Sequence, residues 1–158
     1  MKSRTCCFTG HRSINKLQYP IIKLRLKKAL CQLIDDGYTY FGAGGALGFD
    51  TLAAQTVIEL RKKYPKIKLI LVLPCLTQAE RWSEDDKIIY EAIKEAADKI
   101  VYTSQDYTKG CMFKRNRHLV DCSSVCVCYQ TKDTGGTAYT VHYALQKGIR
   151  IINIAKKN

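Results

Sequence analysis

The chain has 158 residues, 46% of them hydrophobic, and a formal net charge of +12. This length and composition predict a single globular domain covering residues 1–158, with enough apolar side chains for a full core. No apolar run reaches the ~18 residues that a membrane-spanning helix requires, and the N-terminal residues lack the apolar region of a signal peptide. We therefore expect a cytoplasmic protein that has no membrane partner.

The excess of positive charge favours an anionic partner, either a phosphate-bearing small molecule or a nucleic acid. The lysines and arginines are spread along the chain, however, and such a spread is also typical of ordinary solvent-exposed helix faces. Aromatic residues do not alternate with the basic runs. The sequence therefore does not predict a stacking platform for single-stranded nucleic acid.

The eight cysteines form no C-x-x-C motif, and most of them lie inside apolar runs. In a cytosolic chain this pattern predicts small buried side chains, here at Cys6, Cys7, Cys31, Cys75, Cys126 and Cys128. One candidate metal-ligating set exists, but its spacing matches no standard zinc pattern, so no metal site is predicted. Its members are His118, Cys122, Cys126 and Cys128.

Strand-like and helix-like segments alternate along the chain. Apolar, β-prone runs predict six strands, at residues 4–8, 38–41, 67–73, 100–102, 125–129 and 149–154. Apolar residues at helical spacing predict the intervening helices, at residues 20–34, 50–64, 83–97, 110–121 and 138–147. This alternation predicts an α/β fold, a three-layer Rossmann-like sandwich with a mostly parallel sheet of about six strands.

The second predicted strand leads into a glycine-rich turn, residues 42–50, and then into a helix. Glycine lets backbone N–H groups approach a ligand, and a helix N-terminus favours a phosphate or carboxylate. Leu47 stands where the dinucleotide-binding pattern G-x-G-x-x-G has its third glycine, and the turn follows the second strand, not the first. Conventional NAD binding is therefore not predicted, and the turn on its own could equally serve packing.

Three polar or glycine-rich segments fall at strand ends: residues 9–12, 42–50 and 134–137. Because parallel strands end at one edge of a sheet, we expect these segments to line one ligand crevice. The candidate ligand-binding residues are Thr9, Gly10, His11, Arg12, Gly44, Gly45, Ala46, Gly48, Asp50, Arg115, Asn116, Gly135, Gly136 and Thr137.

Several of these residues have a structural alternative. Arg12 could pair with a phosphate through two hydrogen bonds or be a surface loop arginine, and His11 could contact the ligand or hold its loop. Asp50 could bind a ribose hydroxyl or cap the helix that begins there, and Thr137 could bind an anion or cap the last helix. Arg115 and its neighbour Asn116 reach the crevice edge, or Arg115 is solvated. No catalytic set is recognisable.

The segments C-F-T-G-H-R at residues 7–12, G-G-A-L-G-F-D at 44–50 and G-G-T at 135–137 together resemble the SLOG superfamily, and most closely its YpsA-like group. Residues 44–50 and the run Arg115-Asn116-Arg117 also resemble DNA-processing A (Smf) proteins. That second resemblance implies a Rossmann-like domain that binds single-stranded DNA.

A further resemblance is to the LOG-type phosphoribohydrolases, whose signature is P-G-G-x-G-T-x-x-E. Here Gly135 and Gly136 match the leading glycines, whereas the position of the catalytic glutamate holds His142. The resemblance implies that the phosphate-binding half of the motif is kept and that the acid–base half is missing.

Three functional hypotheses follow. The first is binding or sensing of a nucleotide or nucleotide-derived ligand, with its phosphate against Gly135, Gly136 and Thr137 and with no other cofactor. The second is hydrolysis of an N-glycosidic bond in such a ligand, for which Asp50 and His142 are the candidate groups. The third is binding of single-stranded nucleic acid. We expect a ligand-binding protein in preference to an enzyme, and a homodimer by analogy with related domains.

Overall fold

The computed structural model describes residues 1–156. Six strands form one sheet in the order β4-β3-β2-β1-β5-β6, and every pairing between neighbours is parallel. A short 3-10 turn, η1 (Lys2–Arg4), precedes them. The strands are β1 (Thr5–Gly10), β2 (Tyr40–Ala43), β3 (Lys68–Leu73), β4 (Lys99–Tyr102), β5 (Val125–Tyr129) and β6 (Arg150–Asn153).

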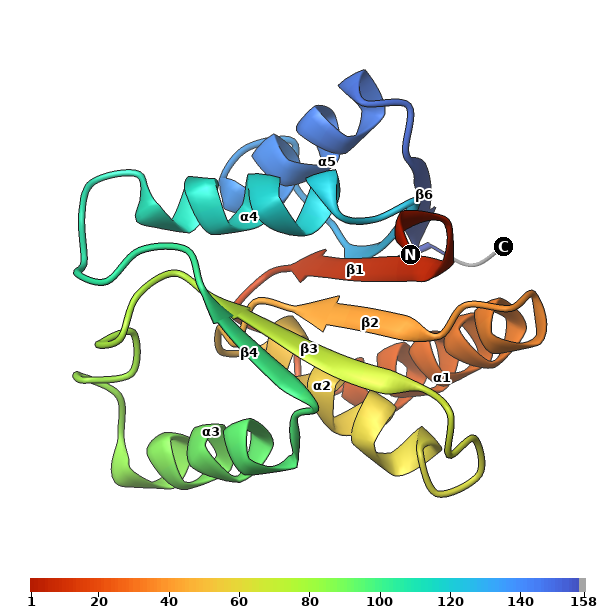
Figure 1. The fold of residues 1–158 in the computed structure, drawn as a ribbon, viewed down its shortest axis with the longest axis horizontal. Coiled ribbons are helices and arrows are strands. Elements are labelled where there is room, and N and C mark those ends of the chain that lie inside the picture. Colours follow the sequence, from red (N-terminus) through yellow and green to blue (C-terminus); the bar gives the residue numbers. More distant parts are fainter. Residues whose placement is uncertain (157–158) are drawn as a thin grey trace.

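Five helices cover the two faces of this sheet (Figure 1). One face carries α1 (Tyr19–Asp35), α2 (Phe49–Leu60) and α3 (Glu84–Ala96), and the other carries α4 (Cys111–Asp121) and α5 (Gly136–Gln146). The predicted three-layer Rossmann-like sandwich is therefore confirmed, with a sheet that is entirely parallel.

Local sequence signals explain where the helices begin. Pro20 lies in the first turn of α1, where its missing N–H costs nothing because that donor has no intrahelical partner. Ser83 caps α3, because its hydroxyl accepts a hydrogen bond from the Asp86 backbone N–H at 3.2 Å. Acidic residues then fill the first turn of α3 and complement the helix dipole.

Two hydrophobic layers hold the sandwich together. The larger layer lies under α1, α2 and α3, and it includes the stacked rings of Phe8 and Phe41, whose centroids are 6.3 Å apart. The smaller layer lies under α4 and α5, and it includes Cys7, Cys126 and Cys128. Because the central strands β1 and β5 are covered on both faces, their residues form almost continuous apolar runs.

Most predicted element boundaries differ from the observed ones by a few residues. β1 continues to Gly10, because Gly10 pairs with Tyr129 in the neighbouring strand β5. β2 includes Gly42, which the sequence pattern placed in a turn, and Gly42 pairs with Ile70 of β3. Cys31, which lies in α1, is only half-buried and not fully buried as expected. The other five cysteines of that prediction are buried.

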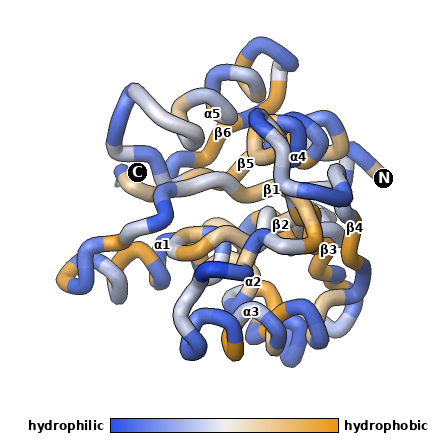
Figure 2. The backbone as a smooth tube through the Cα atoms, turned by 90° about the vertical axis from the view of Figure 1, so that its left-hand side faces the viewer, coloured by the Kyte–Doolittle hydropathy of each residue, from blue (hydrophilic) through white to orange (hydrophobic). Residues whose placement is uncertain are grey.

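All six strands run in the same direction, so their C-terminal ends meet at one edge of the sheet, which faces left in Figure 1. Figure 2 looks onto this edge and shows hydrophobic residues concentrated along the strands, with hydrophilic residues in most of the outer loops. The three segments predicted to bind a ligand all lie at this edge, where the first two begin in the last residues of β1 and β2 and the third follows β5. Across residues 1–156, no helix has both the length and the apolar character needed to cross a bilayer.

Candidate functional site at the C-terminal edge of the sheet

The loop after β1 and the glycine turn after β2 pack directly against each other. The Phe49 backbone N–H donates to the His11 carbonyl oxygen at 3.0 Å. Gly48 has a φ of +78°, and a methyl group on it would lie 2.3 Å from the Arg12 carbonyl group. A methyl group on Gly10 would likewise lie 2.4 Å from the Phe49 ring. Gly10 and Gly48 therefore allow the two loops to approach, a packing role that explains both glycines.

His11 connects the β1 loop to the loop that follows β5. Its Nε2 atom accepts a hydrogen bond from the Thr131 backbone N–H at 2.9 Å, and its ring packs edge-on against Tyr129 at 5.6 Å. Burial, and then the positive charge of Lys132, lower the pKa of His11 from its ordinary value. The neutral ring that accepts this bond carries its proton on Nδ1.

Asp50 and Arg115 place two charged groups in the interior at this edge. Asp50 is 7% exposed and Arg115 is 4% exposed. Asp50 is the second residue of α2 and does not cap it, since the N-cap is Gly48 and that cap has no side-chain hydrogen bond. Its Oδ2 atom accepts from the Ala46 backbone N–H at 3.2 Å. Burial raises the pKa of Asp50, and the charges of Arg115 and Arg12 partly oppose that rise.

Arg115 extends from α4 into the interior and is held on several sides. Its Nη1 atom donates to the Gly44 carbonyl oxygen and, at 3.5 Å, to Gln78 Oε1. Its Nε atom donates to Asn116 Oδ1 at 2.7 Å, and Nη2 lies 3.7 Å from Met112 Sδ. Burial lowers the pKa of Arg115, and the charge of Asp50 opposes this effect. The sequence-based alternative of a solvated Arg115 is therefore wrong.

Gly44 is the point on which the two buried charges converge. A methyl group on Gly44 would lie 2.7 Å from Arg115 Nη1 and 2.9 Å from Asp50 Oδ2. Only glycine leaves room for both side chains above this backbone position. The next residue, Gly45, accepts a hydrogen bond from Gln78 Nε2 at 3.3 Å, so Gln78 supports the same turn from the loop after β3.

The third predicted segment is more open. Gly135 is the N-cap of α5 with a φ of +97°, and both Gly135 and Gly136 are exposed with no atom near the position of an added methyl group. Thr137 is buried as the second residue of α5 and does not cap it. The first backbone N–H groups of α5 have no intrahelical acceptor, so they are available to an anion.

Two of the three predicted segments contact each other directly, and the third is connected to them through a loop. Direct contacts link residues 9–12, residues 44–50 and Arg115, with Thr9 buried inside β1 next to Cys128. Residues 135–137 connect to this cluster through the β5–α5 loop, which contacts His11 at Thr131. The site thus has a buried part around Gly44 and an exposed part at the start of α5.

Gln78 is a site residue that the sequence reasoning missed. It contacts Arg115, Gly45 and the Tyr90 hydroxyl, the last at 3.2 Å. A signal for it exists, because Gln78 follows the third strand at the same edge where the other segments lie. Trp82, in the same loop, packs edge-on against Tyr90 at 5.0 Å, which agrees with a packing role for that side chain.

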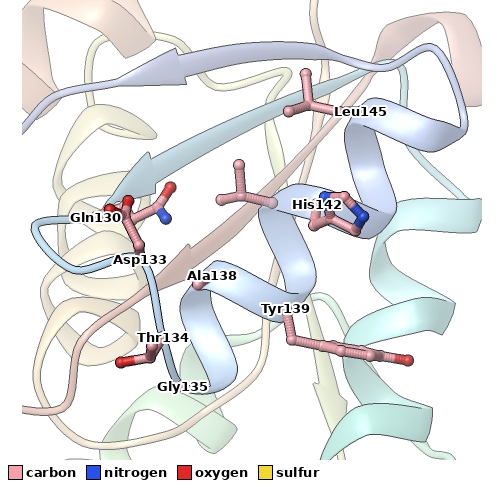
Figure 3. A pocket seen from close by; sticks show the side chains of 9 residues that line it. Gln130, Asp133, Thr134, Gly135, Ala138, Tyr139, His142 and Leu145 are labelled. Atoms are coloured by element: carbon pink, nitrogen blue, oxygen red, sulfur yellow. The ribbon is translucent and has the colours of Figure 1, made fainter.

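Two grooves border the site along α5 and α4. The first has a volume of about 620 Å³ and runs beside α5 (Figure 3); its lining is Gln130, Asp133, Thr134, Gly135, Ala138, Tyr139, Val141, His142 and Leu145. The second has a volume of about 360 Å³ and lies at the start of α4, and Tyr139 lines it as well. Neither groove is lined by Asp50 or Arg115.

His142 and Asp50, the two groups considered for hydrolysis, belong to different places. His142 lies in the groove beside α5, where its ring is 3.3 Å from Gln146 Nε2. Asp50 is buried and accepts a hydrogen bond from the Ala46 backbone N–H, with the charge of Arg115 near enough to influence its pKa. The structure therefore does not assemble these two groups into one reaction centre.

Comparisons with known proteins agree with the fold and the motifs. The YpsA model, described as the YspA SLOG family, matches residues 6–154. A UPF0398 protein of Bacillus pumilus is 34% identical over 131 residues, which cover 81% of this chain and 69% of the relative. A UPF0398 protein of Bacillus thuringiensis is 32% identical over 130 residues, covering 80% of this chain and 71% of the relative.

A solved structure with a similar fold is that of DNA processing protein A from Helicobacter pylori, which was described for its single-stranded DNA binding mode. The TM-score is 0.65 with 20% sequence identity, and the match covers 95% of this chain and 64% of that protein. The present chain thus spans slightly less than two thirds of its structural neighbour, and at this identity the likeness concerns the fold. Together with the family match, these findings show that the chain belongs to the YpsA family of the SLOG superfamily.

Proposed function

We propose that the protein binds a nucleotide or nucleotide-derived molecule at the C-terminal edge of its sheet. The observation that carries this proposal is the convergence of Asp50 and Arg115 on Gly44. Burying two charged groups costs on the order of several kcal/mol of desolvation free energy per ion, a cost that apolar side chains at the same positions would not have. Buried charges at the edge where α/β proteins bind ligands support a recognition site at this position.

The exposed turn at Gly135 and Gly136 supports a phosphate subsite. Its backbone N–H groups and the dipole of α5 favour an anion, and the space above both glycines is open. Arg12 is exposed on the neighbouring loop and close enough to influence the pKa of Asp50, so its guanidinium can supply a second charged contact. The sugar and base would then lie over residues 9–12 and 44–50.

A second candidate function is binding of single-stranded nucleic acid. It is supported by the net charge of +12 and by the fold shared with DNA processing protein A, whose structure was described for that activity. Of the Arg115-Asn116-Arg117 run, Arg115 is buried, whereas Arg117 reaches the surface and donates to the Tyr139 hydroxyl at 2.9 Å. Only Arg117 of the two arginines is therefore positioned to meet a nucleic-acid backbone.

A thermal-shift screen tests the first function. The screen compares AMP, NAD, ADP-ribose and cyclic nucleotides with adenosine, which lacks a phosphate. We expect at least one phosphate-bearing ligand to raise the melting temperature and adenosine to leave it unchanged, because ligand binding to the folded state stabilises it. If no phosphate-bearing ligand raises the melting temperature, the proposal is wrong.

Two variants at one position locate the phosphate. Gly136→Asp introduces a negative charge at the start of α5 and should abolish the shift. Gly136→Ala is the matched control, since it keeps the backbone N–H group, adds no charge and meets open space. If both variants respond to the ligand like the unmodified protein, the phosphate is bound elsewhere.

A further inference from the structure

An aromatic pair lies on the surface between α4 and α5. The ring centroids of Phe113 and Tyr139 are 4.5 Å apart at an interplanar angle of 64°. The two side chains are 40% and 38% exposed, respectively, so each ring keeps a free surface. Figure 3 shows Tyr139 extending from α5 toward α4. No local sequence pattern predicts this aromatic pair, because the two residues come from different helices and meet only in the folded chain.

Basic side chains surround this pair. The groove of about 360 Å³ at the start of α4 is lined by both rings and by Lys109, Lys114 and Arg117, and no acidic residue lines it. None of these three cations takes part in an ion pair among residues 1–156. The groove therefore presents uncompensated positive charge beside two exposed aromatic rings.

Arg117 is fixed in place beside the rings. Its Nη1 atom donates to the Tyr139 hydroxyl at 2.9 Å, which uses one of the five guanidinium N–H groups and leaves the others free for phosphate oxygens. This hydrogen bond also holds the Tyr139 ring against Phe113. The aromatic surface and the cation are thus one preorganised unit, which reduces the entropy lost on binding.

We propose that this α4–α5 groove is a contact site for single-stranded nucleic acid. A base packs against Phe113 and Tyr139, and the flanking phosphates contact Lys109, Lys114 and Arg117. Aromatic side chains with neighbouring cations are the combination that binds single strands without sequence preference, because every base has a π-face. A double helix keeps its bases stacked and paired, so it cannot use these rings. The inference rests on the second candidate function and assigns it a surface.

The two grooves adjoin at Tyr139, which lines both of them. A strand that crosses Tyr139 from the start of α4 reaches the groove beside α5, where Gly135 forms part of the lining. The phosphate subsite proposed at the start of α5 and the aromatic pair therefore lie along one path on the surface. Nucleotide binding and strand binding can share the Gly135–Gly136 turn.

Two ligands separate the role of the rings from that of the charges. Fluorescein-labelled oligothymidylate of 20 nucleotides is compared, by fluorescence anisotropy at low salt, with a labelled strand of equal length made of abasic sites. The double variant Phe113→Leu with Tyr139→Leu should bind the thymidylate roughly 5- to 100-fold more weakly, as expected for losing base–aromatic stacking. Its affinity for the abasic strand should fall much less, because all three cations remain, although Arg117 loses its hydrogen bond to the Tyr139 hydroxyl.

The charge variant should behave differently. Lys109→Ala with Lys114→Ala should weaken binding of both strands and reduce the slope of log K against log salt by about 1.4, since each lost phosphate contact removes about 0.7 for single strands. The matched control is Lys62→Ala with Lys66→Ala, which removes the same charge from the connection before β3 at the other edge of the sheet. That control should leave the salt slope unchanged.

Tyr139→Phe refines the assignment, because it keeps the ring and removes only the hydroxyl that holds Arg117. It should keep most of the preference for thymidylate over the abasic strand, which the double variant Phe113→Leu with Tyr139→Leu should lose. Its ring is already partly exposed, so the folded state should survive, and circular dichroism checks this for every variant.

The outcomes distinguish the inference from the function on which it rests. If the unmodified protein binds neither strand at low salt, the nucleic-acid function itself is wrong. If it binds the thymidylate and the aromatic double variant binds it equally well, the function stands and the groove is not the contact site. If the aromatic variant loses affinity for both strands to the same extent, base stacking is overturned as the role of the rings.

Discussion

The guanidinium of Arg115 donates a hydrogen bond to the carbonyl oxygen of Gly44 and thereby joins α4 to the turn after β2. Asp50 approaches the same glycine from α2. One backbone position thus gathers a buried cation and a buried anion from helices on opposite faces of the sheet. This arrangement gives the candidate site its most specific geometry, and it leads to the first two predictions.

Gly44→Ala should destabilise the protein. The added methyl group would lie under 3 Å from both Arg115 and Asp50, and overpacking of this kind costs about 1–3 kcal/mol. Urea denaturation of the variant should show that loss. Gly136→Ala serves as the control at an open position and should change the unfolding free energy by less than about 0.5 kcal/mol. Equal stabilities of the two variants would contradict the packing seen around Gly44.

Arg115→Met should lower the free energy of unfolding more than Arg117→Met does. Removing the guanidinium leaves the buried Gly44 carbonyl oxygen without its donor and removes the positive charge near Asp50, and a buried acceptor left unsatisfied costs about 1–3 kcal/mol. Arg117→Met removes a surface cation and should cost about 1 kcal/mol or less. Chemical denaturation of both variants measures the difference. A loss below that of Arg117→Met would show that Arg115 does not stabilise the interior.

His11 should make stability depend on pH. Burial, and then Lys132, lower the pKa of His11 from 6.5, so the unfolded chain binds the proton at a higher pH than the folded protein does. The stability contributed by neutral His11 is therefore complete above pH 6.5 and is lost as the pH falls through the folded pKa. Melting temperatures between pH 7.5 and pH 5 measure this loss.

The matched variant for this test is His11→Gln, whose side-chain oxygen can still accept the Thr131 N–H bond but does not titrate. Its melting temperature should fall less between pH 7.5 and pH 5 than that of the unmodified protein. Parallel pH profiles for the two proteins would mean that His11 has the same pKa in the folded and unfolded states.

Incubation with AMP should release no adenine. The two candidate groups for glycosidic cleavage lie in separate places, because His142 lines the groove beside α5 and Asp50 does not. Chromatography of a long incubation at high protein concentration measures free base. Adenine release that disappears in Asp50→Asn would contradict this prediction and would restore hydrolysis as a function.

Much of the fold follows from local patterns. Strand and helix alternation predicts the parallel sheet because parallel strands require crossovers. The runs at residues 69–73 and Val125–Tyr129 have the continuous apolar character of covered strands. The positions of the three ligand-binding segments follow from the same rule, since the loops after parallel strands meet at one edge. That β1 continues to Gly10 and that β2 includes Gly42 could not be predicted, because ladder pairing with neighbouring strands overrides the turn preference of glycine.

The finer geometry of the site depends on contacts between distant residues. The sequence position of Asp50 suggests a helix cap, yet its carboxylate accepts from the Ala46 N–H and lies near Gly44. The Arg115 guanidinium reaches the same glycine from α4, which is far away in the sequence. Similarly, Phe113 and Tyr139 meet because α4 and α5 pack side by side on one face of the sheet. Neither relationship has a local signal in the sequence.

Binding of a phosphate-bearing ligand at the start of α5 can be seen directly in a crystal structure grown with a ligand that stabilises the protein. We expect a phosphate oxygen within hydrogen-bond distance of the backbone N–H of Gly136 or Thr137, with the rest of the molecule over residues 9–12 and 44–50. A ligand whose phosphate contacts neither N–H group, and which lies away from both loops, would contradict this expectation.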